Sequence, residues 1–413
     1  MNATIATPDC VVCGGPTAVC LDLGSQPLAN ALLDKSSTQF EAYPLGLATC
    51  AACSHGQLTH FVPPDLLFKN YLYASGTGDA LNPFFTWFSA ALSKALPNGG
   101  RVLEIACNDG SLLDRLRDDG FQVCGVDPAA NLTSVAISKG HDVRTGFFPE
   151  TRPDGKFDAI VAMNVCAHTP EPRALMQGVK DLLAPDGAAI IQTSQAFMLL
   201  NGEFDTIYHE HYSFFTPASM RRLAESCGLT LEARQIFSVH GRSLVSILRH
   251  AGQSLNPFAL EGGPPFAVSW PDPEPAIMAR DIDRETSFNA YNAFATQARN
   301  VMAKAHDRIG AHQRRGGPVA LVGVAAKALT FITAAGIKPD IFIDEAALKV
   351  GRFVPGASRA IEPLSAARDL PSDTLFMIGA WNFAEPLAAK IRAQRPNAQS
   401  QFLVCLPELK EFN

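Results

Sequence analysis

The 413-residue chain is longer than one hydrophobic core usually covers, so two or three domains are expected. Its net charge of −6 is mild and no cluster of lysine and arginine stands out, which argues against a nucleic-acid partner. No segment approaches the roughly 18 uncharged apolar residues of a membrane span, and the N-terminus lacks a basic region followed by an apolar stretch, so we expect a cytoplasmic chain without a membrane partner.

Residues 1–66 are expected to form a small module in which zinc replaces a missing hydrophobic core. Cys10 and Cys13 form one Cys-x-x-Cys pair, and Cys50 and Cys53 form a second. Because the two intervening residues turn the backbone, both thiolates of a pair can reach one ion, and two pairs complete a closed tetrahedral Zn²⁺ site. The pattern therefore predicts a structural zinc, with buried free thiols or a redox pair as the alternatives.

Residues 67–250 are expected to form a parallel α/β domain, because short apolar runs alternate with helical stretches. A helix is predicted from Asn82 to a Pro-Asn-Gly-Gly turn at 97–100, and a capped helix from Thr216 to Gly228. The predicted strands lie at 101–106, 122–126, 157–163, 188–192, 229–237 and 243–248.

Residues 251–413 are expected to form a second α/β domain after a stretch rich in proline and glycine at 251–273. One or two long helices are predicted from 274 to about 314. The predicted strands lie at 319–324, 341–343 and 374–378. No internal repeat is evident.

A ligand cleft is predicted at the ends of the first two strands of the middle domain. The first strand runs into a tight turn that ends in Gly110, and the second ends in Asp127, whose carboxylate can accept hydrogen bonds from ribose hydroxyls. A dinucleotide fold would normally show Gly-x-Gly-x-x-Gly, of which only Gly110 is present, so S-adenosylmethionine fits better than NAD. The turn alone is also compatible with an ordinary α/β crossover.

Short blocks of distinctive sequence follow the cysteine pairs along almost the whole chain. They occupy residues 23–30, 71–76, 104–110, 126–128, 163–168, 204–211, 323–327, 349–356 and 380–383. With these blocks in this order, the chain resembles the deoxysugar C-methyltransferases, which methylate C-3 of nucleotide-linked 4-keto sugars in deoxysugar and antibiotic biosynthesis. The resemblance implies a zinc module, a class I (Rossmann-like) methyltransferase domain and a C-terminal α/β domain, with the acceptor held between the last two.

The same resemblance implies the site residues and the partner. The residues that it places at the cofactor are Tyr73, Glu104, Asn108, Gly110, Asp127 and Asn164, with Asp127 on the ribose. It suggests catalytic roles for Tyr208, Glu210 and His211. The partner would be a small molecule, a nucleotide-linked keto sugar, and the enzyme a monomer or small homo-oligomer.

Methyl transfer to carbon independently calls for these residue types. Removing a proton beside a ketone gives an electron-rich enolate, and histidine can take that proton near neutral pH, while a carboxylate can orient it and a tyrosine can hydrogen-bond the developing oxyanion. The sequence does not settle the local geometry of this segment, so His209 is a competing candidate for the base. The family pattern favours His211. A structural role at the sheet edge is the alternative for the whole group.

Two segments beside the cleft depart from the family pattern. Residues 192–195 read Gln-Thr-Ser-Gln where the family commonly has a glutamate followed by Val-Pro, and 106–108 read Ala-Cys-Asn in place of Gly-Ser-Asn. A C-methyltransferase of a non-sugar carbonyl compound is therefore an alternative, and a non-catalytic ligand-binding scaffold is a weaker one. Lys327 and Arg352 could neutralise a nucleotide diphosphate or be ordinary surface cations.

Overall fold

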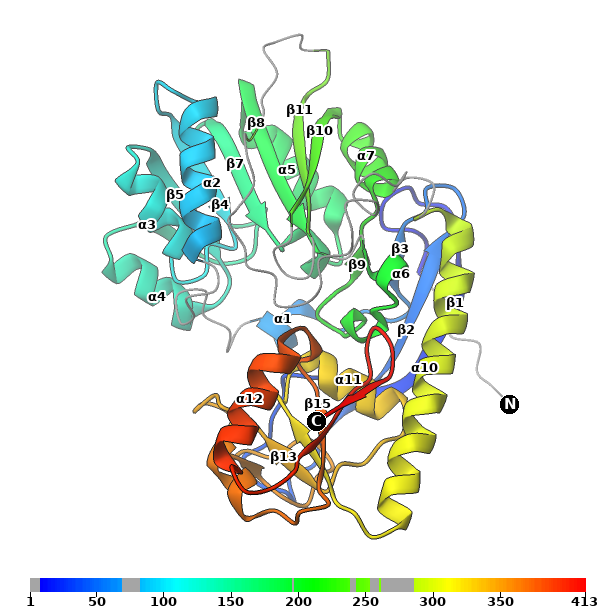
Figure 1. Cartoon of the computed structure of the whole chain (residues 1–413). Coiled ribbons are helices and arrows are strands. Elements are labelled where there is room, and N and C mark those ends of the chain that lie inside the picture. The colour runs from blue at the N-terminus through cyan, green and yellow to red at the C-terminus, as the bar shows by residue number, and fades with distance from the viewer. Residues whose placement is uncertain (1–7, 69–81, 195–196, 238–242, 253–259, 261–285) are drawn as a thin grey trace.

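A computed structural model describes residues 8–68, 82–194, 197–237, 243–252, 260 and 286–413. The described residues form three β-sheets, and the sheet of the middle domain lies above the C-terminal domain in Figure 1. The predicted mixed α/β class is confirmed. The boundaries expected after residues 66 and 250 stay a prediction. No helix in these ranges combines the length and hydropathy needed to cross a membrane.

The N-terminal module contains an antiparallel sheet that the sequence did not predict. Its strand order is β1-β2-β3-β9, and the strands are β1 (Thr17–Pro27), β2 (Ala42–Cys50), β3 (Gly56–Leu58) and β9 (Ser213–Phe214). The last strand comes from the middle of the chain and pairs with the segment that follows the second cysteine pair. A short helix, α1 (Pro64–Phe68), completes the module.

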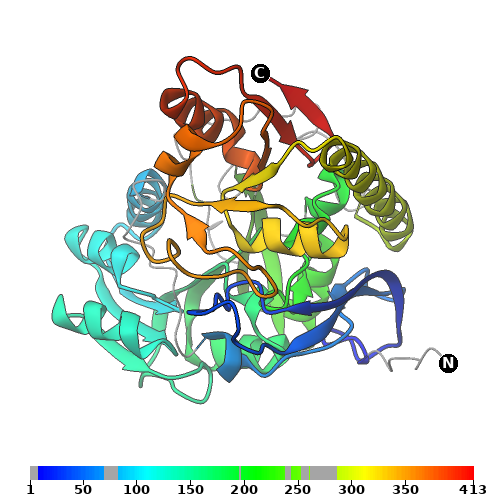
Figure 2. The same ribbon diagram turned by 90° about the horizontal axis from the view of Figure 1, so that it is seen from below.

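The expectation that zinc alone replaces a core in this module is wrong. Leu21, Leu47 and Leu58 are fully buried and share a hydrophobic cluster with Tyr291 and Phe294. Both aromatic residues belong to the long helix α10 (Phe288–Arg314), which contacts β1, β2 and the C-terminal sheet. Figures 1 and 2 show this helix along one flank of the molecule, beside the N-terminal strands. The module therefore shares its core with the C-terminal part of the chain.

The middle domain is a sheet of order β10-β11-β8-β7-β4-β5-β6. Strands β6, β5, β4, β7 and β8 are parallel, and β11 and β10 extend the sheet in antiparallel fashion. The strands are β4 (Arg101–Ile105), β5 (Gln122–Asp127), β6 (Asp142–Thr145), β7 (Phe157–Met163), β8 (Leu183–Thr193), β10 (Leu229–Phe237) and β11 (Ser243–His250). All predicted strands are confirmed, and the polar edge strand β6 is an addition.

Helices cover the faces of this sheet, and short helices lie within the loops at its lower end in Figure 1. The longer ones are α2 (Asn82–Ala95), α3 (Ser111–Asp118), α4 (Ala130–Ser138), α5 (Pro172–Leu182) and α7 (Pro217–Ser226). The short ones are η2 (Cys166–His168), α6 (Met198–Asn201) and η3 (Phe204–Thr206). The predicted Thr216 cap is present, since its side chain accepts a hydrogen bond from the Ser219 N–H.

The C-terminal domain repeats the strand order of the middle domain. Its sheet runs β14-β13-β12-β15-β16-β17, in which only β17 is antiparallel to its neighbour. The elements are β12 (Val319–Val322), α11 (Ala326–Ala334), β13 (Ile341–Ile343), β14 (Ile361–Glu362), η5 (Leu364–Asp369), β15 (Leu375–Ile378), η6 (Trp381–Phe383), α12 (Ala384–Gln394), β16 (Gln401–Val404) and β17 (Lys410–Phe412). Strands β12 to β16 thus correspond to β4 to β8, a repeat that the sequence did not reveal.

Candidate functional site

The four predicted metal ligands come together at one point. The Sγ atoms of Cys10 and Cys53 are 3.6 Å apart, those of Cys13 and Cys50 are 3.5 Å apart, and all four lie within 4.8 Å of one another. Tetrahedral zinc with Zn–S bonds of about 2.3 Å requires sulfur atoms roughly 3.8 Å apart. The cluster therefore fits a four-thiolate zinc ion without rearrangement of the backbone.

The two cysteine pairs use the same turn. The N–H of Gly14 donates to the Cys10 carbonyl at 2.7 Å, and the N–H of Ser54 donates to the Cys50 carbonyl at 2.9 Å. Both donors have left-handed backbone, with φ of 73° and 55°. The hydrogen bond from the Cys53 thiol lowers the pKa of Cys10 to about 5, so this pair already favours one thiolate at neutral pH.

A cavity of about 650 Å³ lies where the carboxyl ends of β4, β5 and β7 face the C-terminal domain. Predicted site residues on its wall are Glu104, Asn108, Asp127, Asn164, Tyr208 and His211. The C-terminal domain contributes Lys327 and Asn382 to the same wall. Tyr73, another predicted cofactor residue, lies outside the described residues.

Two residues with left-handed backbone and the carboxylate of Asp127 fix the conformation of the turn after β4. Ala106 and Asn108 have φ of 57° and 52°. The carboxylate of Asp127 accepts the N–H of Asn108 at 2.9 Å and the N–H of Ala129 at 2.8 Å. A carboxylate offers about four acceptor positions, so Asp127 can hold this turn and still accept ribose hydroxyls.

Gly110 does not line the cavity. It has φ of 78°, and a Cβ atom there would lie 3.0 Å from the ring of His141 and 3.1 Å from Cβ of Ala136. Glycine is needed at this position because α4 packs closely behind the turn. The geometry gives Gly110 a packing role behind the predicted cofactor position.

The part of the cavity predicted to hold the cofactor is acidic and contains acceptor atoms without hydrogen-bond partners in the described ranges. Burial raises the pKa of Glu104 well above its usual range, and the nearby charges of Asp127 and Asp109 add to this effect. Oε2 of Glu104 and Oδ1 of Asn164 are buried and have no hydrogen-bond partner among the described residues. A cationic ligand with N–H donors would satisfy both groups, which fits the ammonium group of S-adenosylmethionine.

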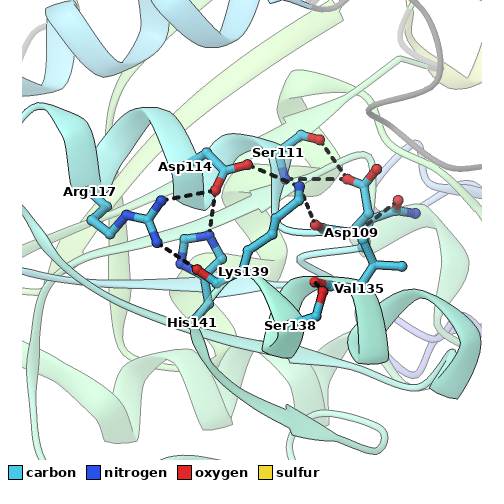
Figure 3. Close-up of polar contacts among 9 residues, drawn as sticks. Asp109, Ser111, Asp114, Arg117, Val135, Ser138, Lys139 and His141 are labelled. Atoms are coloured by element: carbon cyan, nitrogen blue, oxygen red, sulfur yellow. Dashed lines mark hydrogen bonds and ion pairs between the residues drawn. The ribbon is translucent and has the colours of Figure 1, made fainter.

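A polar network behind the turn was missed by the sequence analysis (Figure 3). Nζ of Lys139 donates to the carbonyl of Asp109 at 2.8 Å and forms an ion pair with Asp114 at 3.0 Å. Nε2 of the buried His141 lies 2.7 Å from the same carboxylate. The network links the turn after β4 to α3 and the end of α4. In the sequence, the only sign of this network is a lysine and a histidine near the end of a helix.

His211, also on the cavity wall, has a defined hydrogen-bond pattern. Its Nδ1 lies 2.7 Å from the carbonyl of Thr206, which places the proton on Nδ1, and its Nε2 is 3.1 Å from the Tyr208 hydroxyl. Nε2 therefore accepts from Tyr208. Burial, together with the nearby His168 ring, lowers the pKa of His211 well below its usual value. His211 is thus a neutral imidazole at pH 7.

Glu210, the third member of the predicted group, points elsewhere, as does the competing base His209. Glu210 is buried and accepts a hydrogen bond from the side-chain amide of Asn30, and it is not on the cavity wall. The expected contact between Glu210 and His211 is replaced by the contact between Thr206 and His211. The competing base, His209, also lies off the wall, with its Nε2 3.3 Å from the carbonyl of Tyr43.

The buried histidines predict a stability that falls in acid. Burial lowers the pKa of His168 to about 4, and that of His211 also falls. The unfolded chain takes up these protons near pH 6.5 and the folded chain does not, so stability is complete above pH 6.5 and declines below it. We expect a loss of about 2 kcal/mol from His168 between pH 6.5 and 5, with a further loss in the same direction from His211.

Urea unfolding at pH 7.5, 6.5 and 5 measures this loss, with metal content checked at each pH. His168→Gln is the matched variant, because the amide nitrogen of glutamine can reach the position of the His168 Nε2 atom. Its unfolding free energy should depend less steeply on pH. A free energy that stays constant from pH 7.5 to 5 would contradict the burial of neutral histidines.

Comparison with known proteins finds three matching domain families. They are a zinc binding domain at residues 10–68, a methyltransferase domain at 84–234 and a C-methyltransferase C-terminal domain at 277–407. The C-methyltransferase NovU of Streptomyces niveus is 30% identical and covers 97% of this chain and 96% of its own length. A ubiquinone biosynthesis O-methyltransferase of Xanthomonas axonopodis pv. citri is 29% identical over 37% of this chain and 71% of its own.

Solved structures also match the chain in part. The magnesium protoporphyrin IX methyltransferase of Synechocystis PCC 6803, with bound SAH, has 15% sequence identity. The match covers 44% of this chain and 90% of that one, with a TM-score of 0.34.

Proposed function

Because the chain belongs to the family of S-adenosylmethionine-dependent C-methyltransferases, we propose that it methylates the carbon beside the ketone of a nucleotide-linked deoxysugar. The observation that carries the proposal is the cavity that joins an acidic cofactor end to the Tyr208–His211 pair. S-adenosylmethionine supplies an electrophilic methyl group when bound. The zinc ion is structural, since four thiolates leave it no open position.

The cofactor end of the cavity suits the donor in three ways. Oε2 of Glu104 and Oδ1 of Asn164 offer acceptors to an ammonium group. Asp127 offers its remaining acceptor positions to the ribose. The acidic group as a whole favours a positively charged ligand.

The other end suits removal of a proton from carbon. His211 is neutral at pH 7, and the Thr206 carbonyl holds its Nδ1–H, so the Nε2 lone pair is the basic site. We infer that the acceptor displaces the Tyr208 hydroxyl from Nε2 and that His211 takes the proton beside the ketone. The Tyr208 hydroxyl then remains within reach of the developing charge. Glu210 would support this loop through Asn30 without contacting the base.

A change in cofactor affinity should follow from substitution of Asp127. We expect Asp127→Ala to weaken binding of S-adenosylhomocysteine by about 10- to 100-fold, the usual loss for hydrogen bonds to a charged acceptor. Isothermal titration measures it. Asp344→Ala is the matched control, because Asp344 accepts the N–H groups of Val324 and Ala346 in the C-terminal domain as Asp127 does in the middle domain.

Because Asp127 also holds the turn after β4, a second ligand separates the two roles. An analogue of S-adenosylhomocysteine without ribose hydroxyls should bind the wild type and Asp127→Ala with similar affinity. Unchanged affinity of Asp127→Ala for S-adenosylhomocysteine itself would overturn the ribose assignment.

The acceptor class is tested by turnover and titration with a panel of compounds. The panel contains nucleoside diphosphate 4-keto-6-deoxyhexoses with different bases, the free keto sugars, and non-sugar ketones. A non-sugar acceptor is the second candidate, because Gln192 stands on the cavity wall where the family commonly has a glutamate, with its Nε2 2.8 Å from Oγ of Ser243. Methylation confined to non-sugar ketones would favour that candidate and overturn the first.

A further inference from the structure

The C-terminal domain places an ammonium group on the wall of the reaction cavity. Lys327 is the second residue of α11, which begins shortly after β12 ends. Strand β12 lies between β13 and β15, so the turns after β12 and β15 diverge at the switch point of this sheet. Lys327 follows the first strand and Asn382 follows β15, and both reach the cavity there. The fold of this domain therefore directs a cation toward His211 and Tyr208.

The surroundings of Lys327 hold it in place and keep it charged. Its Nζ is 3.5 Å from a carboxylate oxygen of Glu203 and lies 5.5 Å from the centre of the Trp381 ring. The indole N–H of Trp381 donates to the buried Asp205 at 2.8 Å. Burial alone would lower the pKa of Lys327, but the charges of Asp205 and Glu203 outweigh it and raise the pKa. One third of the side chain remains accessible.

This ionic group is joined to the segment that carries the base. Asp205 belongs to η3, and the next residue, Thr206, supplies the carbonyl that orients His211. Thr206, Tyr208, His211 and Lys327 all line the same cavity. The charge of Lys327 also contributes to the low pKa of His211, after burial and His168. A base and a fixed cation therefore face the same space.

We propose that Lys327 binds the carbonyl oxygen of the acceptor and stabilises the enolate that His211 generates, an inference that rests on the proposed function. In this step the C–H bond beside the carbonyl breaks and the proton moves to Nε2 of His211. The electron pair of that bond forms a carbon–carbon double bond, and the π pair of the carbonyl moves to the oxygen next to the ammonium of Lys327. Methylation of the carbon then restores the carbonyl group.

The ammonium of Lys327 can stabilise an enolate better on the cavity wall than on the solvent-exposed surface. An enolate oxygen concentrates negative charge that the ketone lacks, so a cation placed in advance stabilises the transition state more than the ground state. Glu203, Asp205 and Trp381 act as positioning residues, because they hold the ammonium without reaching the cavity wall themselves. Binding of the diphosphate of the acceptor is the competing role for Lys327.

Exchange of solvent deuterium into the acceptor separates these two roles. The probe is the nucleoside diphosphate 4-keto-6-deoxyhexose with the highest turnover in the panel, incubated with S-adenosylhomocysteine in D₂O. Lys327→Met should lower both exchange and methyl transfer by about 10²- to 10³-fold, the usual effect of removing an oxyanion donor. Its affinity for S-adenosylhomocysteine should remain that of the wild type. Lys327→Gln, which keeps a donor, should lose less and serves if the Met variant unfolds.

Lys390→Met is the matched control, because Lys390 is a half-exposed lysine of the same domain that pairs with Glu345 away from the cavity. This variant should catalyse deuterium exchange into the acceptor at the wild-type rate. Wild-type exchange by Lys327→Met, together with a raised KM and weaker inhibition by the nucleoside diphosphate alone, would overturn the enolate role in favour of diphosphate binding. Absence of exchange in the wild type with every compound of the panel would instead contradict the proposed function, and the role of Lys327 with it.

Discussion

His211→Asn should lower methyl transfer by at least about 10²-fold, the usual scale for the loss of a general base. Asparagine keeps an amide N–H near the position of Nδ1, so the contact with the Thr206 carbonyl can survive while the basic Nε2 is lost. Binding of S-adenosylhomocysteine and of the acceptor should therefore stay close to that of the wild type. Steady-state turnover, together with isothermal titration of both ligands, measures this difference.

Neighbouring residues supply the controls for this variant. His209→Gln should retain activity, because His209 lies off the cavity wall and glutamine can reach the Tyr43 carbonyl from the Nε2 position. Glu210→Gln and Tyr208→Phe should each cost less than His211→Asn, since they support the transfer without taking the proton. Loss of activity in Tyr208→Phe as large as in His211→Asn would show that the proton passes through the Tyr208 hydroxyl.

Deuterium exchange gives a second measurement of the same step. Wild-type enzyme should exchange the proton beside the ketone before any methyl group is transferred, because enolisation precedes attack. His211→Asn should not. Equal exchange in both proteins, or normal turnover of the variant, would move the role to His209 or a bound water and leave the methyltransferase assignment intact.

Local sequence signals predicted the parts of the fold that depend on neighbouring residues. The spacing within each cysteine pair is set by a single turn, so the four ligands could be identified without any tertiary information. The buried strands β4, β5, β7 and β8 read as short apolar runs. Asp127 could be placed because a carboxylate at the end of the second strand follows from the topology.

Features that depend on distant contacts could not be predicted in this way. Leu21 and Leu47 are core residues because their strands pack on α10, about 240 to 270 residues later in the sequence. Strand β6 is polar and lies at the sheet edge, so it lacks an apolar run. The correspondence between Asp127 and Asp344 appears only when the two sheets are compared, because the turns beside them differ in sequence.

The orientation of the reacting loop is the clearest limit at the site. Tyr208, Glu210 and His211 were predicted as one catalytic group, yet of these three only Tyr208 and His211 line the cavity. In this turn the N–H of His211 donates to the Tyr208 carbonyl at 2.9 Å, which brings positions 208 and 211 to one side. Glu210 then points toward Asn30. In an extended segment alternate residues share a side, so position 208 would lie with 210 and position 209 with 211. The sequence favours neither geometry.

The zinc site should affect both stability and the position of His211. Strand β3 follows the second cysteine pair within three residues and pairs with β9, which begins two residues after His211. The N–H of Leu58 also donates to the carbonyl of Tyr212 at 3.0 Å. Loss of the metal would loosen the turn from which β3 starts, and the pairing with the reacting segment would weaken with it.

We therefore expect one tightly bound zinc per chain in protein purified without added metal, and a Cys13→Ser variant that loses the metal and several kcal/mol of unfolding free energy. Cys124→Ser is the matched control, because Cys124 is a buried cysteine of the middle domain outside the cluster, and it should keep one zinc. Metal analysis and urea unfolding measure the two effects. A metal content below about half an equivalent in the wild type, or a disulfide within either cysteine pair, would refute the four-thiolate site.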